Sequence, residues 1–497
     1  MYDCLKEECG VFGTRNYKDG SVFPYIYWGL RAQNHRGHQS HGMITFDGGF
    51  HTYKSLDLVP KIKRAEIQNW LNRLPGHVGI GNVRYTTSGG TDEQSLIRGT
   101  QPFLIETGKT RFAVSFNGNI INHFKLRSQI KESLPQFCYA CDVELIGRKM
   151  GMELGKDRYL ASAVRSCMNE VEGAFSVAGL TENAELFAFK DPYGIKPLCC
   201  GHSPEGTIQA VSSETVSLDI NGLDLDFELK PGELVIASKE GFVREQLVQC
   251  KRRALCAFEF AYFARPDSRL GGKFVYETRE EFGRNLAKEY GDFAKDSDII
   301  ISLPETGDDV ALGLHEATGL RWERAVRRHR YVTERAFILL PEERYATIDR
   351  KLNVLGRKIR GKKVAVTEDS IVRGDTTKVV IEKLRRMGAE KVYMFITFPR
   401  IIGPCFYGID MATYGELIGS RHQPEEIAEI IGADAVNYQS IRGFVKSIGL
   451  QENELCLGCV TGTYPTPLAQ KMADEMREKF ERGHKETGRI YEVSSVI

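Results

Sequence analysis

Beyond residue 280, strand-like apolar runs alternate with helix-like stretches, and this alternation constrains the fold more than any other feature of the chain. The strand-like runs are "SDIIISLP" (297–304), "KKVAVTEDS" (362–370) and "KVYMFITFP" (391–399). The helix-like stretches include "GDDVALGLHEATG" (307–319) and "TTKVVIEKLRRMGAE" (376–390). A strand–helix–strand order predicts a largely parallel sheet with crossover helices.

Residues 1–240 show a different pattern of predicted secondary structure. Short β-like runs broken by Gly and Asn recur there, as in "GHVGIGNVRYTTSGG", "RFAVSFNGN", "GAFSVAGL", "LFAFKDPYG" and "GELVIAS". Such spacing predicts layered antiparallel sheets. A chain of 497 residues is too long for one ordinary core. The change from short β-like runs to alternating strands and helices places a domain boundary near residues 240–260. Near the C-terminus, "PLAQKMADEMREKFERGHKE" predicts one amphipathic helix.

Charge and composition exclude several classes of protein. Lys and Arg total 67 against 66 Asp and Glu, and this balance gives no electrostatic footprint for nucleic acid or an anionic membrane. No stretch approaches the ~18 uninterrupted apolar residues of a membrane span. The acidic opening "MYDCLKEE" is unlike a secretory signal. We therefore expect a cytoplasmic protein, in which twelve cysteines favour metal binding or catalysis over disulfides.

The stretch "VAVTEDSIVRGDTT" (364–377) combines a buried strand with a polar loop that opens a helix. Ligands of open α/β sheets bind at the carboxyl ends of the strands, where Glu368 and Asp369 lie. Backbone N–H groups and hydroxyls from Ser370 to Thr377 suit a phosphate. The acidic pair suits ribose hydroxyls or a Mg²⁺ ion that carries pyrophosphate oxygens. An ordinary strand-to-helix turn is the alternative that the spacing alone leaves open.

Within this stretch, "DSIVRG" resembles the 5-phosphoribosyl-1-pyrophosphate (PRPP) motif of type I phosphoribosyltransferases, in the form found in the glutamine PRPP amidotransferase family. The motifs "FARPDS", "LPETG", "KLN" and "PCFYGID" follow that family's order. The resemblance implies that Thr306 lies near a Mg²⁺ ion with Glu368 and Asp369, and that Arg335 belongs to a mobile loop. The PRPP-binding residues that it implies are Glu368, Asp369, Ser370, Arg373, Gly374, Asp375, Thr376, Thr377 and Arg335.

The opening segment "EECGVFG" places Cys9 directly after a short acidic leader. The same family begins its mature chain with this cysteine, so the resemblance implies that residues 1–8 are a propeptide that is removed. A thiolate is a strong nucleophile, and a freed α-amino group has a pKa near ~8, which suits a base for the thiol. While Glu8 is attached, that nitrogen is an amide and cannot accept the proton.

Other residues of the first half suit a glutaminase reaction at this thiol. The segment "FNGN" offers the side-chain amide of Asn117 and the backbone N–H of Gly118 as an oxyanion hole. Arg84 suits the α-carboxylate of glutamine and Asp142 its α-ammonium. Arg36 of "NHRG" matches a further family motif, and the resemblance implies that it also binds glutamine. Taken singly, each has a plain structural explanation, such as a surface charge or a turn. Their order, together with the resemblance, favours the glutaminase interpretation.

Four cysteines form a third group: Cys256, Cys405, Cys456 and Cys459. Only "CLGC" (456–459) is locally suggestive, and one C-x-x-C is typical of zinc sites, redox pairs and buried thiols alike. Cys138 and Cys141 make a second C-x-x-C, so a four-thiolate zinc site is an alternative. In the iron–sulfur branch of the family, cysteines occupy the motifs that read here "CAFEFAYF", "PCFYGID" and "CLGCVTGTYPT". The resemblance therefore implies a 4Fe–4S cluster that is bound by Cys256, Cys405, Cys456 and Cys459.

The chain departs from the family pattern at positions that carry charge. Asp375 stands in the phosphate loop where the family has threonine, and Lys196 stands where it has arginine. A carboxylate ~4 Å from one phosphate charge, at an effective dielectric near 20, costs about 4 kcal/mol before screening. We therefore expect a weakened affinity for PRPP unless Asp375 points away from the phosphate.

The resemblance implies an N-terminal nucleophile (Ntn) αββα glutaminase sandwich followed by a type I phosphoribosyltransferase parallel-sheet domain, which combines α+β and α/β classes. The domains that we expect are a propeptide (1–8), a class II glutamine amidotransferase domain (9–245), a phosphoribosyltransferase domain (255–450) and a C-terminal cluster-binding segment and helix (451–497).

The function that the resemblance implies is glutamine-dependent amination of PRPP to 5-phosphoribosylamine, the first committed step of de novo purine synthesis, with Mg²⁺ and a 4Fe–4S cluster as cofactors. Purine nucleotides would inhibit it, and the chain would form a homodimer or homotetramer. One alternative is a diverged paralogue whose glutaminase feeds another phosphorylated acceptor. Another is a non-catalytic iron–sulfur regulatory scaffold, which would have no need to free Cys9.

Overall fold

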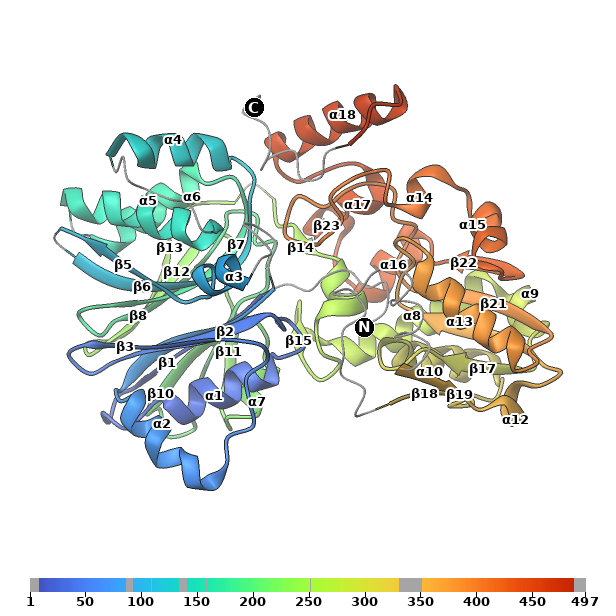
Figure 1. The fold of residues 1–497 in the computed structure, drawn as a ribbon, viewed down its shortest axis with the longest axis horizontal. Coiled ribbons are helices and arrows are strands. Elements are labelled where there is room, and N and C mark those ends of the chain that lie inside the picture. The colour runs from blue at the N-terminus through green and yellow to red at the C-terminus, as the bar shows by residue number, and fades with distance from the viewer. Residues whose placement is uncertain are drawn as a thin grey trace.

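The structure, a computed structural model, describes residues 9–85, 93–108, 110–133, 141–157, 159–250, 252–329 and 351–486. Two halves lie side by side, with two stacked sheets in the first half and a sheet surrounded by helices in the second (Figure 1). Within the described ranges, no helix is long and apolar enough to cross a membrane.

The first half is built on two antiparallel sheets. The 7-stranded sheet runs in the spatial order β11 (Asp224–Glu228), β9 (Cys199–His202), β10 (Ile208–Ser212), β1 (Gly10–Asn16), β4 (Val78–Arg84), β2 (Ser40–Phe46) and β3 (Phe50–Leu56). The 6-stranded sheet runs in the order β13 (Gly241–Gln246), β12 (Glu233–Ser238), β8 (Leu186–Lys190), β7 (Gly173–Thr181), β6 (Thr110–Ile120) and β5 (Phe103–Thr107). Small and branched side chains from both sheets, such as Val11, Ile80, Ala178 and Leu186, form the core between them.

Helices cover the outer faces of these sheets (Figure 1). The first sheet is covered by α1 (Phe23–Ala32) and α2 (Ile67–Arg73), which belong to one apolar cluster with strand residues such as Phe12. The second sheet is covered by α4 (His123–Ser133), α5 (Asp142–Asp157) and α6 (Leu160–Glu170). Short helices α3 (Glu93–Arg98) and α7 (Val216–Asp219) complete this half. The layers confirm the predicted αββα sandwich.

The second half contains the predicted parallel sheet. Its spatial order is β17 (Ile299–Ser302), β20 (Lys363–Glu368), β21 (Lys391–Ile396) and β22 (Ala435–Tyr438), and each neighbouring pair is parallel. The surrounding helices are α8 (Val275–Glu289), α9 (Gly291–Lys295), α10 (Thr306–Thr318), α12 (Gly356–Ile359), α13 (Asp375–Arg386), α14 (Ile418–Arg421), α15 (Pro424–Ile431) and α16 (Ile441–Ile448). Apolar residues of the strands pack against α13 and α15 on one side and against α8 and α10 on the other.

The C-terminal segment returns to the start of the second half. β23 (Leu455–Cys456) pairs in parallel with β14 (Leu255–Cys256), and Cys256 is the register partner of Cys456. After α17 (Gly458–Thr461), the predicted C-terminal helix is α18 (Pro467–Glu481). Short strand pairs β15 (Arg269–Leu270) with β16 (Lys273–Phe274) and β18 (Val326–Arg328) with β19 (Leu352–Val354) complete the second half.

Candidate active sites

Cys9 immediately precedes β1, which pairs with β10 and β4 inside the first sheet. Its side chain is buried, and its Sγ donates a hydrogen bond to the backbone O of Tyr85 at 3.5 Å. Burial raises the pKa of the Cys9 thiol, although the charges of Arg84 and Arg36 oppose the rise. The thiol is therefore protonated at neutral pH and needs a base before it can attack a carbonyl.

The two predicted oxyanion-hole residues, Asn117 and Gly118, lie on β6, which contacts β1 and β4 of the first sheet. Asn82 of β4 donates to the backbone O of Phe116 at 3.3 Å, and Asn82 is the register partner of Val11, two residues after Cys9. This contact places Asn117, which follows Phe116, beside the start of β1.

The Asn117 side chain is fully buried, and neither its Nδ2 nor its Oδ1 has a hydrogen-bond partner among the described residues. An unsatisfied buried amide costs about 1–3 kcal/mol, so most buried amides are paired. Next to it, a Cβ built on Gly118 would lie 1.9 Å from the backbone O of Ala174. Only glycine allows β6 and β7 to approach this closely. The pair can thus present hydrogen-bond donors to a ligand oxygen.

Arg84 and Asp142 place opposite charges beside the thiol. Arg84 ends β4 and lowers the pKa of Cys9, while Asp142 begins α5 and raises it. Both side chains are buried. Asp142 Oδ2 accepts a hydrogen bond from the backbone N of Ile120 at 2.9 Å, which fixes the carboxylate against the end of β6. This is the charge pattern that an amino-acid zwitterion requires.

Arg36 also reaches the nucleophile, but through the backbone. Its Nε donates to the carbonyl O of Cys9 at 3.3 Å. Its Nη1 donates to Glu214 Oε1 at 2.6 Å and its Nη2 to Glu259 Oε1 at 2.6 Å. Burial alone would lower the pKa of Arg36, but the two carboxylates outweigh burial and raise it. Because Glu259 belongs to the second half, this buried ion pair joins the two halves at the nucleophile.

In the second half, the predicted acidic pair lies where β20 ends. Glu368 and Asp369 are both buried. Asp369 Oδ2 accepts from Thr306 Oγ1 at 2.6 Å and its Oδ1 from Ser370 Oγ at 2.7 Å. Burial raises the pKa of both carboxyls, and Asp369 raises that of Glu368 further. The structure thus brings together the three residues predicted to lie near Mg²⁺, in a donor set of carboxylate and hydroxyl oxygens that suits a hard cation.

The loop after the acidic pair opens α13 as predicted. Gly374 has a φ of +92°, in the left-handed region that favours glycine, and Thr376 and Thr377 are buried in the first helical turn. Arg373 forms an ion pair with Glu416, a residue that the sequence analysis did not single out. Asp375 is the first residue of α13 and is exposed.

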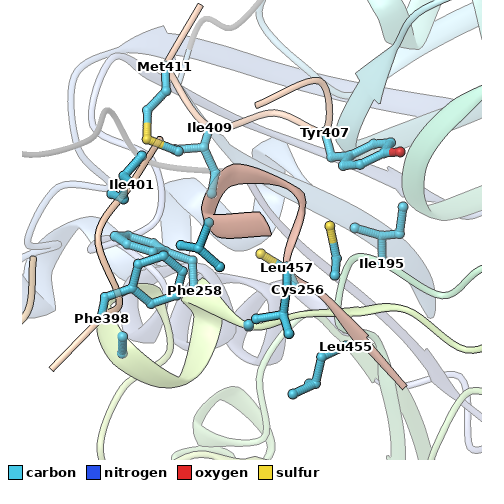
Figure 2. Packing of buried hydrophobic residues seen from close by; sticks show 14 of the residues in the cluster. Ile195, Cys256, Phe258, Phe398, Ile401, Tyr407, Ile409, Met411, Leu455 and Leu457 are labelled. Carbon is cyan, nitrogen blue, oxygen red and sulfur yellow. The ribbon is translucent and has the colours of Figure 1, made fainter. Parts of the chain in front are cut away.

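The four predicted cluster cysteines line one small cavity, with Phe258, Tyr407, Ile409 and Tyr464. Figure 2 shows Cys256, Phe258, Tyr407 and Ile409 in this region. Burial raises the pKa of the Cys256 and Cys459 thiols well above the usual value and that of Cys456 to about 12. The Cys405 charge raises all three further, so these thiols are close neighbours. The backbone N of Tyr407 donates to Cys405 Sγ at 3.3 Å.

Among the residues that the structure describes, no group of three or more His, Cys, Asp or Glu side chains is arranged to hold a single metal ion. A cluster of several irons occupies more space than one ion, so its thiolates need not converge on one point. The alternative pairing with Cys138 cannot be placed, since Cys138 lies outside the described residues. Arg335 and the leader 1–8 also lie outside them.

The sequence analysis gave no role to Glu214, Glu259, Arg279 or Glu416. Glu259 lies within the quoted stretch "CAFEFAYF", but only its cysteine was singled out, and its partner Arg36 is 223 residues away, so no local pattern pairs the two. Arg279 on α8 is buried and donates to the carbonyl O of Phe260 at 2.9 Å and of Ala264 at 2.8 Å. It thereby holds the short π-helical turn Glu259–Phe263.

Comparison with known proteins agrees with this arrangement. A family model described as a glutamine amidotransferase domain matches residues 92–219. The amidophosphoribosyltransferase of Methanocaldococcus jannaschii is 37% identical over 477 residues, which cover 92% of this chain and 98% of the relative. The amidophosphoribosyltransferase of Bacillus subtilis is 34% identical over 478 residues, which cover 94% of this chain and 96% of the relative.

Solved structures extend the likeness to the fold. Glutamine PRPP amidotransferase from B. subtilis, complexed with ADP and GMP, matches with a TM-score of 0.82 at 32% identity, covering 93% of this chain and 98% of that one. A structure described as the allosteric regulatory enzyme of purine biosynthesis also matches with a TM-score of 0.82 at 32% identity, covering 93% of this chain and 97% of that one. This chain therefore belongs to the amidophosphoribosyltransferase family, enzymes that catalyse the glutamine-dependent amination of PRPP in purine biosynthesis.

Proposed function

We propose that this chain releases ammonia from glutamine at Cys9 and transfers it to PRPP, forming 5-phosphoribosylamine. The freed α-amino group takes the thiol proton, and the thiolate attacks the side-chain carbonyl of glutamine. A thioester forms as ammonia leaves, and water then releases glutamate. Ammonia displaces pyrophosphate from the ribose C1. The observation that carries this proposal is the buried amide of Asn117, which has no hydrogen-bond partner in the part of the chain that the structure describes.

The geometry supports distinct roles for the residues around the thiol. Asn117 and Gly118 donate to the oxyanion. Arg84 binds the α-carboxylate of glutamine and Asp142 its α-ammonium, since the two side chains carry opposite charges that both act on the Cys9 thiol. Arg36 is better suited to holding the backbone of Cys9 than to binding glutamine, because its guanidinium already forms ion pairs with Glu214 and Glu259. We also propose that residues 1–8 are removed from this chain, which frees the α-amino group of Cys9.

The phosphoribosyl site is proposed on the loop between β20 and α13. Ser370, Gly374, Thr376 and Thr377 offer hydroxyl and backbone N–H groups at a helix start, which suits the 5-phosphate. The proposal also keeps Arg373, Asp375 and Arg335 as residues near PRPP. Thr306, Glu368 and Asp369 would hold Mg²⁺, which supplies positive charge to the leaving pyrophosphate. The hydrogen bonds that Asp369 accepts from Thr306 and Ser370 support this, since they bring carboxylate and hydroxyl oxygens together at the end of β20.

A 4Fe–4S cluster is proposed on Cys256, Cys405, Cys456 and Cys459. Their shared cavity and the parallel pairing of β14 with β23 support it. Through its thiolate ligands, the cluster would link the start of the second half to the C-terminal segment.

Further features are proposed from the relatives. The B. subtilis structure contains ADP and GMP, so we propose that purine nucleotides inhibit this chain. We also propose a homodimer or homotetramer, a cytoplasmic location and the domain limits given above. Among the described residues, ten cysteines are outside any disulfide, which favours a reducing compartment.

The decisive experiment measures glutamate release by anaerobically purified protein whose leader removal has been checked by mass spectrometry. PRPP with Mg²⁺ should stimulate release, and phosphoribosylamine should form in step with it. Cys9→Ala should abolish both activities. Cys167→Ala, which removes a buried thiol elsewhere in the same half, should retain them. Glutamate release by Cys9→Ala at the wild-type rate would overturn the proposed nucleophile.

One observation favours a second acceptor. Asp375 lies at the first position of α13, beside the proposed phosphate loop. Its negative charge disfavours a dianionic phosphate there. If wild-type glutaminase is active but indifferent to PRPP, the acceptor is another phosphorylated compound. The non-catalytic scaffold is favoured only if the leader stays attached and glutaminase activity is absent.

A further inference from the structure

A buried lysine of the first half lies beside the four-cysteine cavity. Lys196 is 0% exposed and lies between β8 and β9. Its neighbour Ile195 accepts a hydrogen bond on its carbonyl O from the backbone N of Cys256 at 3.0 Å. Figure 2 shows Ile195, Cys256 and Tyr407 around the same space. The segment that carries Lys196 therefore contacts the segment of the other half that carries Cys256.

The ammonium of Lys196 lies against the loop that carries Cys405. A Cβ built on Gly408 would lie 3.3 Å from Lys196 Nζ, so glycine leaves room for the ammonium. The same loop is fixed on its other side, because Asn119 Nδ2 of β6 donates to the carbonyl O of Phe406 at 3.0 Å. The loop 405–408 is thus held between Lys196 and β6.

The charge of Lys196 acts on the cysteines themselves. Lys196 Nζ lies against Gly408, three residues after Cys405, and the adjacent Ile195 accepts from the backbone N of Cys256, so the ammonium lies beside the segments that carry two of the four thiols. Within a buried site the effective dielectric is low, so one nearby cation has a large effect on the stability of thiolates.

We propose that Lys196 is the counter-cation of the four-cysteine site and protects a bound iron–sulfur cluster from oxidation. The inference rests on the proposed 4Fe–4S cluster. A cluster held by four thiolates is an anion, and it becomes less negative when it loses one electron to dioxygen, which is reduced to superoxide. A fixed cation stabilises the more negative state and so opposes this loss.

The test compares full-length, anaerobically purified wild type with Lys196→Gln. Iron and sulfide content are measured first, and the loss of visible absorbance is then followed in air. We expect Lys196→Gln to bind the cluster and to bleach about tenfold faster, since a single charge a few ångströms away has an effect of at least this size. Its reduction potential should fall, and a tenfold change in the equilibrium constant corresponds to about 59 mV for a one-electron couple.

Two variants separate charge from packing. Lys196→Arg keeps the charge and should bleach at the wild-type rate. Lys190→Gln removes another buried lysine of the same half, on β8, and should also behave as the wild type. If Lys196→Gln does not fold, Lys196→Met, which keeps the aliphatic length, replaces it with the same expectation. Equal bleaching rates and equal potentials in the wild type and the neutral variants would overturn the proposal.

Wild-type protein without iron or sulfide would instead refute the cluster. That result leaves the glutaminase and PRPP activities to be judged by the separate assay of glutamate release, so the two failures are distinguishable.

Discussion

Replacing Asn117 with alanine should make the protein less active and more stable. The fully buried amide has no hydrogen-bond partner among the described residues, so its removal relieves a burial cost of about 1–3 kcal/mol. The cavity left by a carboxamide of roughly 30 Å³ costs about 0.7 kcal/mol at ~24 cal/mol per Å³. The net change is a stabilisation of about 1 kcal/mol, which raises the Tm of a domain of this size by about 2–4 °C.

The activity should change in the opposite direction. Removal of one oxyanion donor typically lowers kcat by about 10²–10³-fold, because the donor acts on the charge that develops in the transition state. The assay is glutamate release at saturating glutamine, paired with differential scanning calorimetry of the same preparation. Because an oxyanion donor acts mainly in the transition state, we expect kcat to fall much more than KM rises.

Asn119→Ala provides the matched control. Asn119 is also buried on β6, but its Nδ2 donates to the carbonyl O of Phe406. Its removal should therefore lower the Tm, since it deletes a buried hydrogen bond. If Asn117→Ala unfolds at a lower temperature than the wild type and keeps its kcat within about threefold, the amide is structural and the oxyanion-hole argument is refuted.

Three further predictions concern charged groups. Glu259→Gln leaves Arg36 with one carboxylate, so we expect a loss of about 3 kcal/mol in the free energy of unfolding, measured by calorimetry, whereas Glu240→Gln on the surface should change it little. Asp375→Thr should tighten PRPP binding about tenfold or more in isothermal titration calorimetry, and unchanged affinity would show that the carboxylate points away from the phosphate. Burial raises the pKa of Asp309 to about 6, so Asp309 binds a proton more tightly in the folded protein than in the unfolded chain. The free energy of unfolding should therefore fall as the pH rises from about 4 to about 6. Asp309→Asn should flatten the Tm profile over that range, and an unchanged profile would contradict this assignment.

The sequence predicted those parts of the fold whose signals are local. Strands such as β20 and helices such as α13 were identified because apolar periodicity and turn residues act over a few positions. The residues of "DSIVRG" and "CGVFG" carried a resemblance that comparison with relatives confirms. Asn117 was predicted as an oxyanion donor, but that its amide has no partner within the described segments is a property of the packed interior and has no signature in the sequence.

Partnerships across the chain could not be predicted. Arg36 was expected beside the thiol, yet its partners Glu214 and Glu259 lie 178 and 223 residues further along. No alternation or spacing links positions so far apart, and many carboxylates compete for any arginine in a chain with 66 Asp and Glu. Only the packing of the two halves selects the pair. For the same reason the sequence marked Lys196 as a substitution but not as a neighbour of the cysteines.

The turn Glu259–Phe263 is held from both sides by buried arginines, and this determines how the halves can move. Arg279 donates to the carbonyl groups of Phe260 and Ala264, and Arg36 pairs with Glu259 while donating to Cys9. If the turn moved away from Cys9, Arg36 would keep one carboxylate, and a buried charge that loses a partner is strongly destabilised. Separation of the halves at this point therefore costs several kcal/mol even before apolar surface is exposed. The nucleophile is positioned by the second half as well as by its own sheet.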